Sequence, residues 1–227
     1  IRTPINAVLG MDEMILRESN NPQIREYASD IKQAGSMLLS LINDILDFSK
    51  IESGKMDIIP VDYDLGILLG DTIDMIRSRA EEKKLQLELK IESNTPVHLH
   101  GDEVRLRQII TNILTNAVKY TPEGKVTLTV SGKKVSEEAV QLYISVKDTG
   151  IGIKEEDMGR LFDSFQRVDE SRNRNVEGTG LGLSITMRLL NLMGSGLEVK
   201  STYGEGSDFY FYLEQKQLDD EVIGDDV

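Results

Sequence analysis

The first 53 residues carry apolar side chains at helical spacing. In the second half of this stretch, Ile31, Leu38 and Ile45 lie seven residues apart, as in the seam of a coiled coil. Residues 18–22, Glu-Ser-Asn-Asn-Pro, have the composition of a turn. The pattern therefore predicts two helices joined by a short turn, which form an αα-hairpin.

A single hairpin of this kind cannot cover both of its apolar stripes. Two copies that pair through these stripes would form a four-helix bundle, so we expect a homodimer. The alternative is an ordinary amphipathic hairpin that packs against its own domain.

Beyond residue 56 the pattern alternates between strand and helix spacing. It predicts helices at 65–82, at 102–120 and after residue 179, and strands at 85–91, 126–130, 142–147 and after residues 197 and 208. Because the later strands are joined by short turns, we expect an α+β fold with a largely antiparallel sheet covered by helices on one face. The expected parts are a hairpin at 1–53, a linker at 54–63, the mixed domain at 64–214 and an acidic tail or linker at 215–227.

Composition narrows the function further. The chain has 39 acidic and 26 basic side chains and a formal net charge of -13, which argues against nucleic acid as a partner. It has no cysteine, so disulfides and thiolate metal sites are excluded. No apolar run reaches the roughly 20 residues that span a bilayer, and no signal peptide is visible, so we expect no direct membrane contact and a cytoplasmic location. The start at Ile1, inside a helical pattern, indicates a piece of a longer protein whose other parts could be membrane-anchored.

The predicted helix at 102–120 carries polar side chains on one face. Asn112, Asn116 and Lys119 are spaced by four and three residues, which places them together. Amide oxygens suit a Mg²⁺ ion that sits on phosphate, and a lysine can meet the phosphates directly. The alternative is a polar stripe that faces solvent.

A carboxylate and two glycines follow the strand at 142–147. Asp148 can accept a hydrogen bond from the exocyclic amine of a purine, and Gly150 and Gly152 let the backbone turn sharply beside the ring. The alternative is a plain turn at the end of a strand, where Asp and Gly are common.

A second glycine-rich stretch, Gly178-Thr179-Gly180-Leu181-Gly182, opens a predicted helix. The start of a helix offers free N–H groups to phosphates. No lysine and hydroxyl pair follows, so this is not a Walker loop. The polar stretch before it, 162–177, is typical of a mobile lid whose Arg167, Arg172 and Arg174 could reach a γ-phosphate, or of a surface loop alone.

The two histidines, His98 and His100, precede Gly101 in what we interpret as a polar turn. The sequence offers no third ligand, so a surface turn is favoured over a metal or catalytic role.

Together these motifs resemble the kinase core of a bacterial sensor histidine kinase, most closely the hybrid form with a receiver domain. The matching stretches resemble the tail of the H box (1–6), the second dimerisation helix (41–52), the N box (112–120), the G1 box (148–152), the F box (162–165), the G2 box (178–182) and a final glycine turn (204–207). The resemblance implies a Bergerat-fold ATP-binding domain of the GHKL type, Mg·ATP as ligand and a homodimer built on the hairpin.

The resemblance also assigns roles to single residues. It implies that Asn116 is the principal Mg²⁺ ligand with Asn112 beside it, and that Lys119 touches phosphate. Tyr120 would pack near the base and Asp148 would bind the adenine amine. The cleft would be shaped by Gly150, Gly152, Gly178, Thr179, Gly180, Leu181 and Gly182, with Arg167 and Arg174 as loosely matching basic lid positions.

One part of the family pattern is absent. The H box reads His-Glu before the Ile-Arg-Thr-Pro with which this chain begins, so we expect the phosphoacceptor histidine just upstream of Ile1. Thr3 occupies the position that orients water when phosphate is removed from the partner. The 227 residues alone would then bind ATP without an acceptor for its phosphate.

The predicted function is therefore phosphoryl transfer from ATP to a histidine, and from there to an aspartate of a receiver domain. One alternative is an ATP hydrolase of the same superfamily, which uses a glutamate on the asparagine helix as general base. The helical turn before Asn116 offers Asn112 and no glutamate, which favours a transferase, because a transferase brings its own nucleophile. The other alternative is a dimeric module that binds nucleotide without catalysis.

Overall fold

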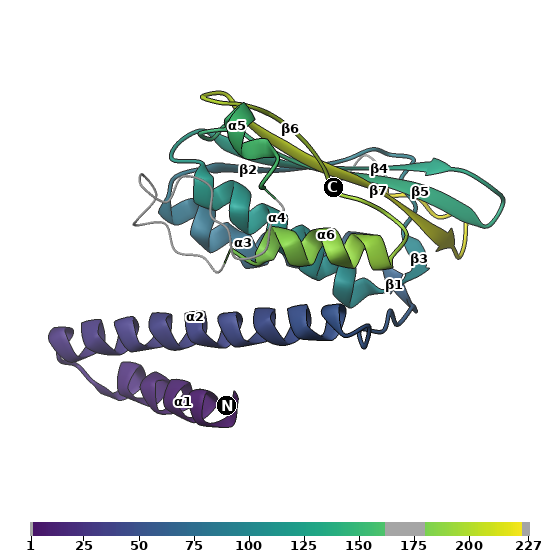
Figure 1. Cartoon of the computed structure of the whole chain (residues 1–227). Coiled ribbons are helices and arrows are strands. Elements are labelled where there is room, and N and C mark those ends of the chain that lie inside the picture. The colour runs from purple at the N-terminus through teal and green to yellow at the C-terminus, as the bar shows by residue number, and fades with distance from the viewer. Residues whose placement is uncertain (1, 162–179, 224–227) are drawn as a thin grey trace. The chain divides into compact units, whose positions relative to one another are not determined.

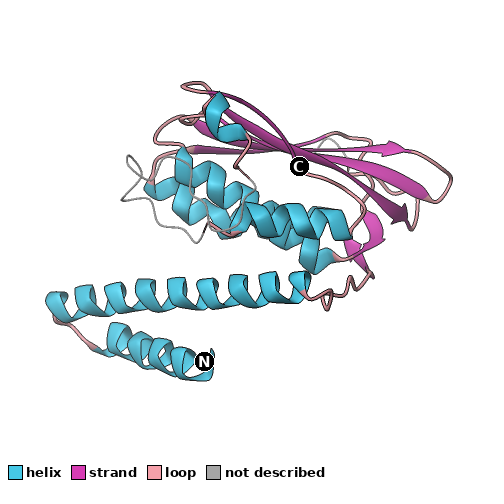
Figure 2. Ribbon diagram, in the orientation of Figure 1, coloured by secondary structure: helices cyan, strands magenta, loops and turns pink. Residues whose placement is uncertain are grey.

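The computed structural model describes residues 2–161 and 180–223. These residues divide into two compact units, 1–56 and 57–227. Figure 1 follows the elements along the chain, and Figure 2 separates helices from strands. No helix in the described ranges is long and apolar enough to cross a membrane.

The first unit is a pair of packed helices, α1 (Arg2–Glu18) and α2 (Pro22–Glu52). Asn21 begins α2, because its side-chain oxygen accepts hydrogen bonds from the backbone N–H groups at the start of the helix, and a proline follows at the first helical position. The two helices approach closely where Gly35 faces Leu9, since a Cβ at Gly35 would lie 2.8 Å from the leucine side chain. The predicted hairpin is therefore present.

The second unit is built on a seven-stranded sheet in the described part of the chain. Its strands run in the order β1-β3-β7-β5-β4-β2, with β6 beside β7, and every pair is antiparallel except β2 with β4. The strands are β1 (Val61–Asp64), β2 (Gln86–Ile91), β3 (His98–Gly101), β4 (Lys125–Lys134), β5 (Ala139–Asp148), β6 (Glu198–Thr202) and β7 (Gly206–Gln217).

Three helices cover one face of this sheet: α3 (Leu65–Glu82), α4 (Glu103–Tyr120) and α6 (Gly182–Leu192) (Figure 2). The short helix α5 (Glu155–Met158), which sequence reasoning missed, follows β5. The apolar positions of α4 are buried: Leu106, Ile109, Ile110, Ile113, Leu114, Ala117 and Val118. The opposite face of α4 is left for polar side chains, as the sequence predicted.

One expectation about these elements is wrong, and the structure adds detail at two boundaries. Residues 98–101 form strand β3, which pairs with β1 and β7, and are not a turn. Strand β1 starts at Val61, so the last residues of the expected linker belong to the sheet. The expected tail is ordered as far as residue 223: β7 runs to Gln217, and Ile223 is buried and donates its backbone N–H to the Thr95 carbonyl.

Candidate nucleotide-binding site

The polar face of α4 lies against the start of α6. The amide nitrogen of Asn112 is 3.5 Å from the Gly182 carbonyl and 3.3 Å from the Thr186 hydroxyl oxygen, both of which can accept its hydrogen bonds. A Cβ at Gly182 would lie 4.0 Å from the amide nitrogen of Asn116. Both asparagines are half-buried, so this face is not an open stripe in solvent.

Two lysines contact the last turn of α4. The ammonium of Lys83 donates to the carbonyls of Val118 and Lys119, at 2.8 Å each, which satisfies oxygens that have no partner within the helix. Burial, and then the nearby charge of Lys119, lower the pKa of Lys83. The ammonium of Lys119 lies 4.7 Å from the ring centre of Tyr120, a cation–π contact.

The turn after β5 is joined to this end of α4. The backbone N–H of Ile151 donates to the Tyr120 carbonyl at 3.1 Å. Gly150 lies so close to that carbonyl that a Cβ at Gly150 would overlap the oxygen. Gly152 adopts φ of 64°, in the left-handed region that favours glycine. The glycines therefore let the turn approach the helix end.

Asp148 ends β5 inside this arrangement and is only 5% exposed. Its Oδ1 accepts a hydrogen bond of 2.8 Å from the Gly150 backbone N–H. Burial raises the pKa of the Asp148 carboxyl above its ordinary value, and the nearby charge of Asp208 raises it a little further. Hydrogen bonds from the backbone N–H groups of Gly150 and Ser207 lower the pKa and offset part of this rise. An ionised carboxylate has about four acceptor positions on its two oxygens, so these backbone bonds leave it able to accept from a ligand as well.

The second glycine stretch is described only from Gly180. Gly180 has φ of 71°, Leu181 is buried, and Gly182 is the first residue of α6. The other candidates there, Arg167, Arg172, Arg174, Gly178 and Thr179, and the F box at 162–165, lie outside the described residues. Thr3 lies in α1, which belongs to the first unit, so its role stays a prediction that is separate from this site.

The sequence comparisons identify the second unit. Residues 101–217 match the family described as histidine kinase-, DNA gyrase B-, and HSP90-like ATPase. The chain belongs to this family. Residues 1–54 match the His Kinase A (phospho-acceptor) domain. The order of the two domains confirms the resemblance to a sensor histidine kinase core.

The chain is similar to sensor kinases of known organisms. It is 43% identical over 213 residues to the sensor protein GacS of Pseudomonas syringae pv. syringae, covering 94% of the chain and 24% of GacS. It is 38% identical over 213 residues to the histidine-protein kinase BarA of Escherichia coli K12, covering 94% of the chain and 23% of BarA. The chain thus spans about a quarter of the length of these relatives.

Solved structures support the fold. Full-length ShkA, determined in complex with AMPPNP, matches 97% of the chain and 45% of its own length with a TM-score of 0.76 and 31% identity. The histidine kinase AdeS of Acinetobacter baumannii matches 93% of the chain and 95% of its own length with a TM-score of 0.63, and its 21% identity shows the fold alone. The expected histidine kinase ATP-binding fold is confirmed.

Two features of this candidate site were missed from sequence. Thr186 contacts Asn112 although 74 residues separate them, and Lys83 holds the end of α4 from 35 residues away. A pattern of residue types along the chain has no signal for such pairs, because only the fold brings them together.

The histidines differ from expectation as well. His98 Nδ1 lies 2.9 Å from a carboxylate oxygen of Asp219 and 3.7 Å from one of Glu221, so further possible ligands are present. The three side chains are between 37% and 66% exposed. We interpret the contacts as polar pairs that join the segment after β7 to β3, because exposed groups of these types pair commonly without an ion.

Proposed function

We propose that this chain is the catalytic core of a sensor histidine kinase of a two-component system. In this proposal it binds Mg·ATP and transfers the γ-phosphate to a histidine, from which the phosphate passes to an aspartate of a receiver domain. The observation that carries the proposal is the half-buried asparagine face of α4 against the start of α6, with the buried Asp148 at the end of β5. The complex of ShkA with AMPPNP supports an adenine nucleotide as the ligand.

Asp148 would recognise the base. Its bond from Gly150 fixes the carboxylate, and its second oxygen would accept from the exocyclic amine of adenine. Tyr120 would pack beside the base, because its carbonyl is bonded to Ile151 in the same turn. Gly150 and Gly152 let the turn pack against the carbonyls of Tyr120 and Thr202, where a Cβ would overlap, and so hold Asp148 and Tyr120 in one place.

Asn116 and Asn112 fit a magnesium ion that is bound to phosphates. Their amide oxygens are neutral, hard ligands, and the amide nitrogen of Asn112 is already engaged with α6, which leaves its oxygen as the coordinating atom. Bound Mg²⁺ would offset the negative charge of the triphosphate. The asparagines would orient it, and Lys119 would meet the phosphates as a point charge.

The start of α6 would bind phosphate oxygens through its N–H groups. This helix has eleven residues, and the left-handed Gly180 and the buried Leu181 bring the chain to its first turn. Free N–H groups and the positive end of the helix dipole favour anions there. The remaining residues of the stretch, Gly178 and Thr179, and the lid arginines Arg167 and Arg174 belong to the same proposal.

The hairpin would supply the phosphoacceptor and the dimer. Its second helix exposes apolar side chains at heptad spacing, with Ile24, Ile31, Leu38 and Ile45 between 44% and 51% exposed. Such a stripe would be covered by a second copy in a four-helix bundle. Thr3 would act near the acceptor histidine, which we place just upstream of Ile1. We place the activity in the cytoplasm, where ATP and receiver domains are available.

Labelled ATP separates the possible activities. A form of the protein that includes the residues upstream of Ile1 is incubated with ATP labelled at the γ-phosphate and then treated with acid and with base. Protein-bound label that is lost in acid and stable in base supports the histidine kinase. Free phosphate alone would indicate a hydrolase, and neither product would indicate a binding module; each of these results contradicts the proposal.

A further inference from the structure

One buried carboxylate joins the segment that enters the second unit to the helix that carries the asparagines. Asp102 is 4% exposed, and both of its oxygens are used. Oδ1 accepts from the backbone N–H of Arg105 at 3.0 Å, which caps α4. Oδ2 accepts from the backbone N–H of Ile59 at 2.8 Å, 43 residues earlier.

The bond to Ile59 extends the pairing of β1 with β3. In that ladder Val61 lies opposite Gly101, so Asp102 is the next residue on one strand and Pro60 the residue before the other. Pro60 has no N–H and cannot continue the ladder. The carboxylate of Asp102 binds the preceding N–H instead, and so fixes residues 57–60 to the beginning of α4.

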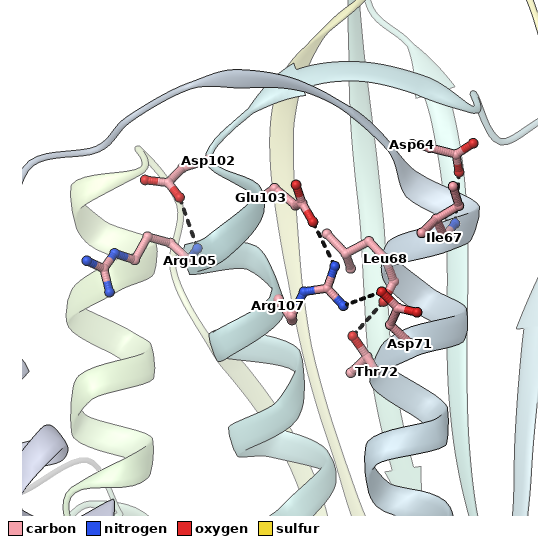
Figure 3. Close-up of polar contacts among 9 residues, drawn as sticks. All are labelled: Asp64, Ile67, Leu68, Asp71, Thr72, Asp102, Glu103, Arg105 and Arg107. Atoms are coloured by element: carbon pink, nitrogen blue, oxygen red, sulfur yellow. Dashed lines mark hydrogen bonds and ion pairs between the residues drawn. The ribbon is translucent and has the colours of Figure 1, made fainter.

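A second group of contacts connects the first turns of α4 to α3. Arg107 donates to Glu103 within the same helix at 2.7 Å and to Asp71 of α3 at 3.1 Å (Figure 3). The Arg107 side chain is 24% exposed, whereas Glu103 and Asp71 are 34% and 58% exposed, so the arginine is the more shielded partner in both pairs. Helix α4 is thereby braced against α3 at the same end at which Asp102 holds the connecting segment.

The same helix carries the two asparagines of the site in its second half. Asn112 and Asn116 lie ten and fourteen residues after Asp102, which is about 15 and 21 Å along an α-helix. A helix packed along its length moves as a body and not by local bending, so a displacement at its first turn is carried to these side chains. Residues 57–60 are also the only covalent path from the first unit into the second.

We propose that Asp102 is a positioning residue that couples residues 57–60 to the nucleotide-binding face of α4. Through it, a displacement of the connecting segment changes the placement of Asn112 and Asn116 and hence the affinity for Mg·ATP. This inference rests on the proposed function. Because coupling between two sites is reciprocal, bound nucleotide in turn stabilises the bond between Ile59 and Asp102.

Two variants remove this bond and keep the helix cap. Asp102→Asn keeps one acceptor oxygen, and asparagine caps helices as well as aspartate does, so the bond from Arg105 survives. The other carboxylate oxygen is replaced by an N–H₂ group, which cannot accept a hydrogen bond from Ile59. Ile59→Pro removes the donor. The matched controls are Ile59→Ala, which keeps the N–H of an already 66% exposed residue, and Asp64→Asn, which changes the cap of α3.

The measurements are calorimetric titration with Mg·AMPPNP and hydrogen exchange, both on the whole chain. We expect Asp102→Asn and Ile59→Pro to weaken nucleotide binding roughly 3- to 10-fold, because only part of the energy of a charged hydrogen bond is passed on to the nucleotide site, and to speed exchange in the first turns of α4. In the unchanged chain, nucleotide should slow exchange of the Ile59 amide. The controls should match the unchanged chain.

The results test the coupling through Asp102 separately from the proposed function. Equal affinity and equal α4 exchange in the two variants and their controls would overturn the coupling. If the unchanged folded chain takes up no nucleotide, the proposed function fails. The coupling is then judged from exchange in α4 without nucleotide, where unchanged rates in Asp102→Asn and Ile59→Pro overturn it as well.

Discussion

Gly206 lies directly against the backbone of Asp148. A Cβ at Gly206 would overlap the Asp148 carbonyl oxygen, and Gly206 adopts φ of 117°, in a region that other residues avoid. The start of β7 thus packs on the end of β5 at the residue that we assign to adenine. The final glycine turn is therefore part of the frame that positions Asp148.

We expect Gly206→Ala to destabilise the second unit and to displace Asp148. The left-handed backbone alone costs about 1–3 kcal/mol for alanine, and the overlap with the carbonyl adds to it. Gly204→Ala is the control, because Gly204 has φ of 88° but nothing within 4 Å of an added Cβ. Urea unfolding of both variants measures the difference. Equal losses of unfolding free energy would show that the close approach to Asp148 has no cost.

Asp148→Asn should weaken ATP binding and change the preference for the base. Losing a charged acceptor for the adenine amine costs about 1.5–3 kcal/mol, or roughly 10- to 150-fold in affinity. An asparagine N–H₂ can instead donate to the carbonyl of guanine, so GTP should lose much less than ATP. Competition titrations with the two nucleotides measure this ratio. The control is Asp208→Asn, whose carboxylate accepts from Ser145 at 2.6 Å; an unchanged ratio in Asp148→Asn would contradict the assignment.

Asp148 should also make stability depend on pH. Burial raises the pKa of its carboxyl in the folded chain, so between the unfolded and folded pKa values the folded state binds more protons than the unfolded state. The contribution of Asp148 to stability therefore falls as pH rises through that window, from about 4 upward. Asp148→Asn removes this loss. Urea unfolding from pH 3.5 to 7 should show the unfolding free energy of the variant rising relative to that of the unchanged chain, whereas Asp74→Asn, at an exposed carboxylate, should follow the unchanged chain.

Leu38→Lys should convert the proposed dimer to a monomer. Leu38 is 48% exposed in the middle of the apolar stripe of α2, and a charge there would be buried at the centre of the bundle. Analytical ultracentrifugation at several protein concentrations measures the change. Met75→Lys, at a 60% exposed position of α3, should remain dimeric. A Leu38→Lys chain that sediments as the unchanged dimer would exclude the stripe as the interface.

The sequence predicted the parts of the fold that depend on local pattern. The periodic apolar residues of 102–120 predicted α4, and the spacing of Asn112 and Asn116 predicted their common face. Asp102 stands at the N-cap of α4 and Pro22 at the first position of α2, two positions that these residue types favour. These elements are specified by neighbours within a few turns of the same helix.

The sequence did not predict features that depend on distant contacts. β3 is only four residues long and polar on one face, and it becomes a strand because β1 and β7 supply partners on both sides. Residues 219–221 are all acidic, yet Ile223 directly after them is buried and donates its backbone N–H to the Thr95 carbonyl, far away in the sequence. The bond between Asp102 and Ile59 likewise has no local signal.

Calorimetric titration of the folded chain with ATP, with and without Mg²⁺, tests the central claim most directly. The proposed site predicts one ATP bound per chain, dependent on Mg²⁺, and much weaker binding in Asn116→Asp, where an added negative charge faces the phosphates. Asn191→Asp, at an exposed position of α6, should bind as the unchanged chain does. The absence of binding heat with Mg·ATP at millimolar concentration, or equal binding in Asn116→Asp, would contradict the account.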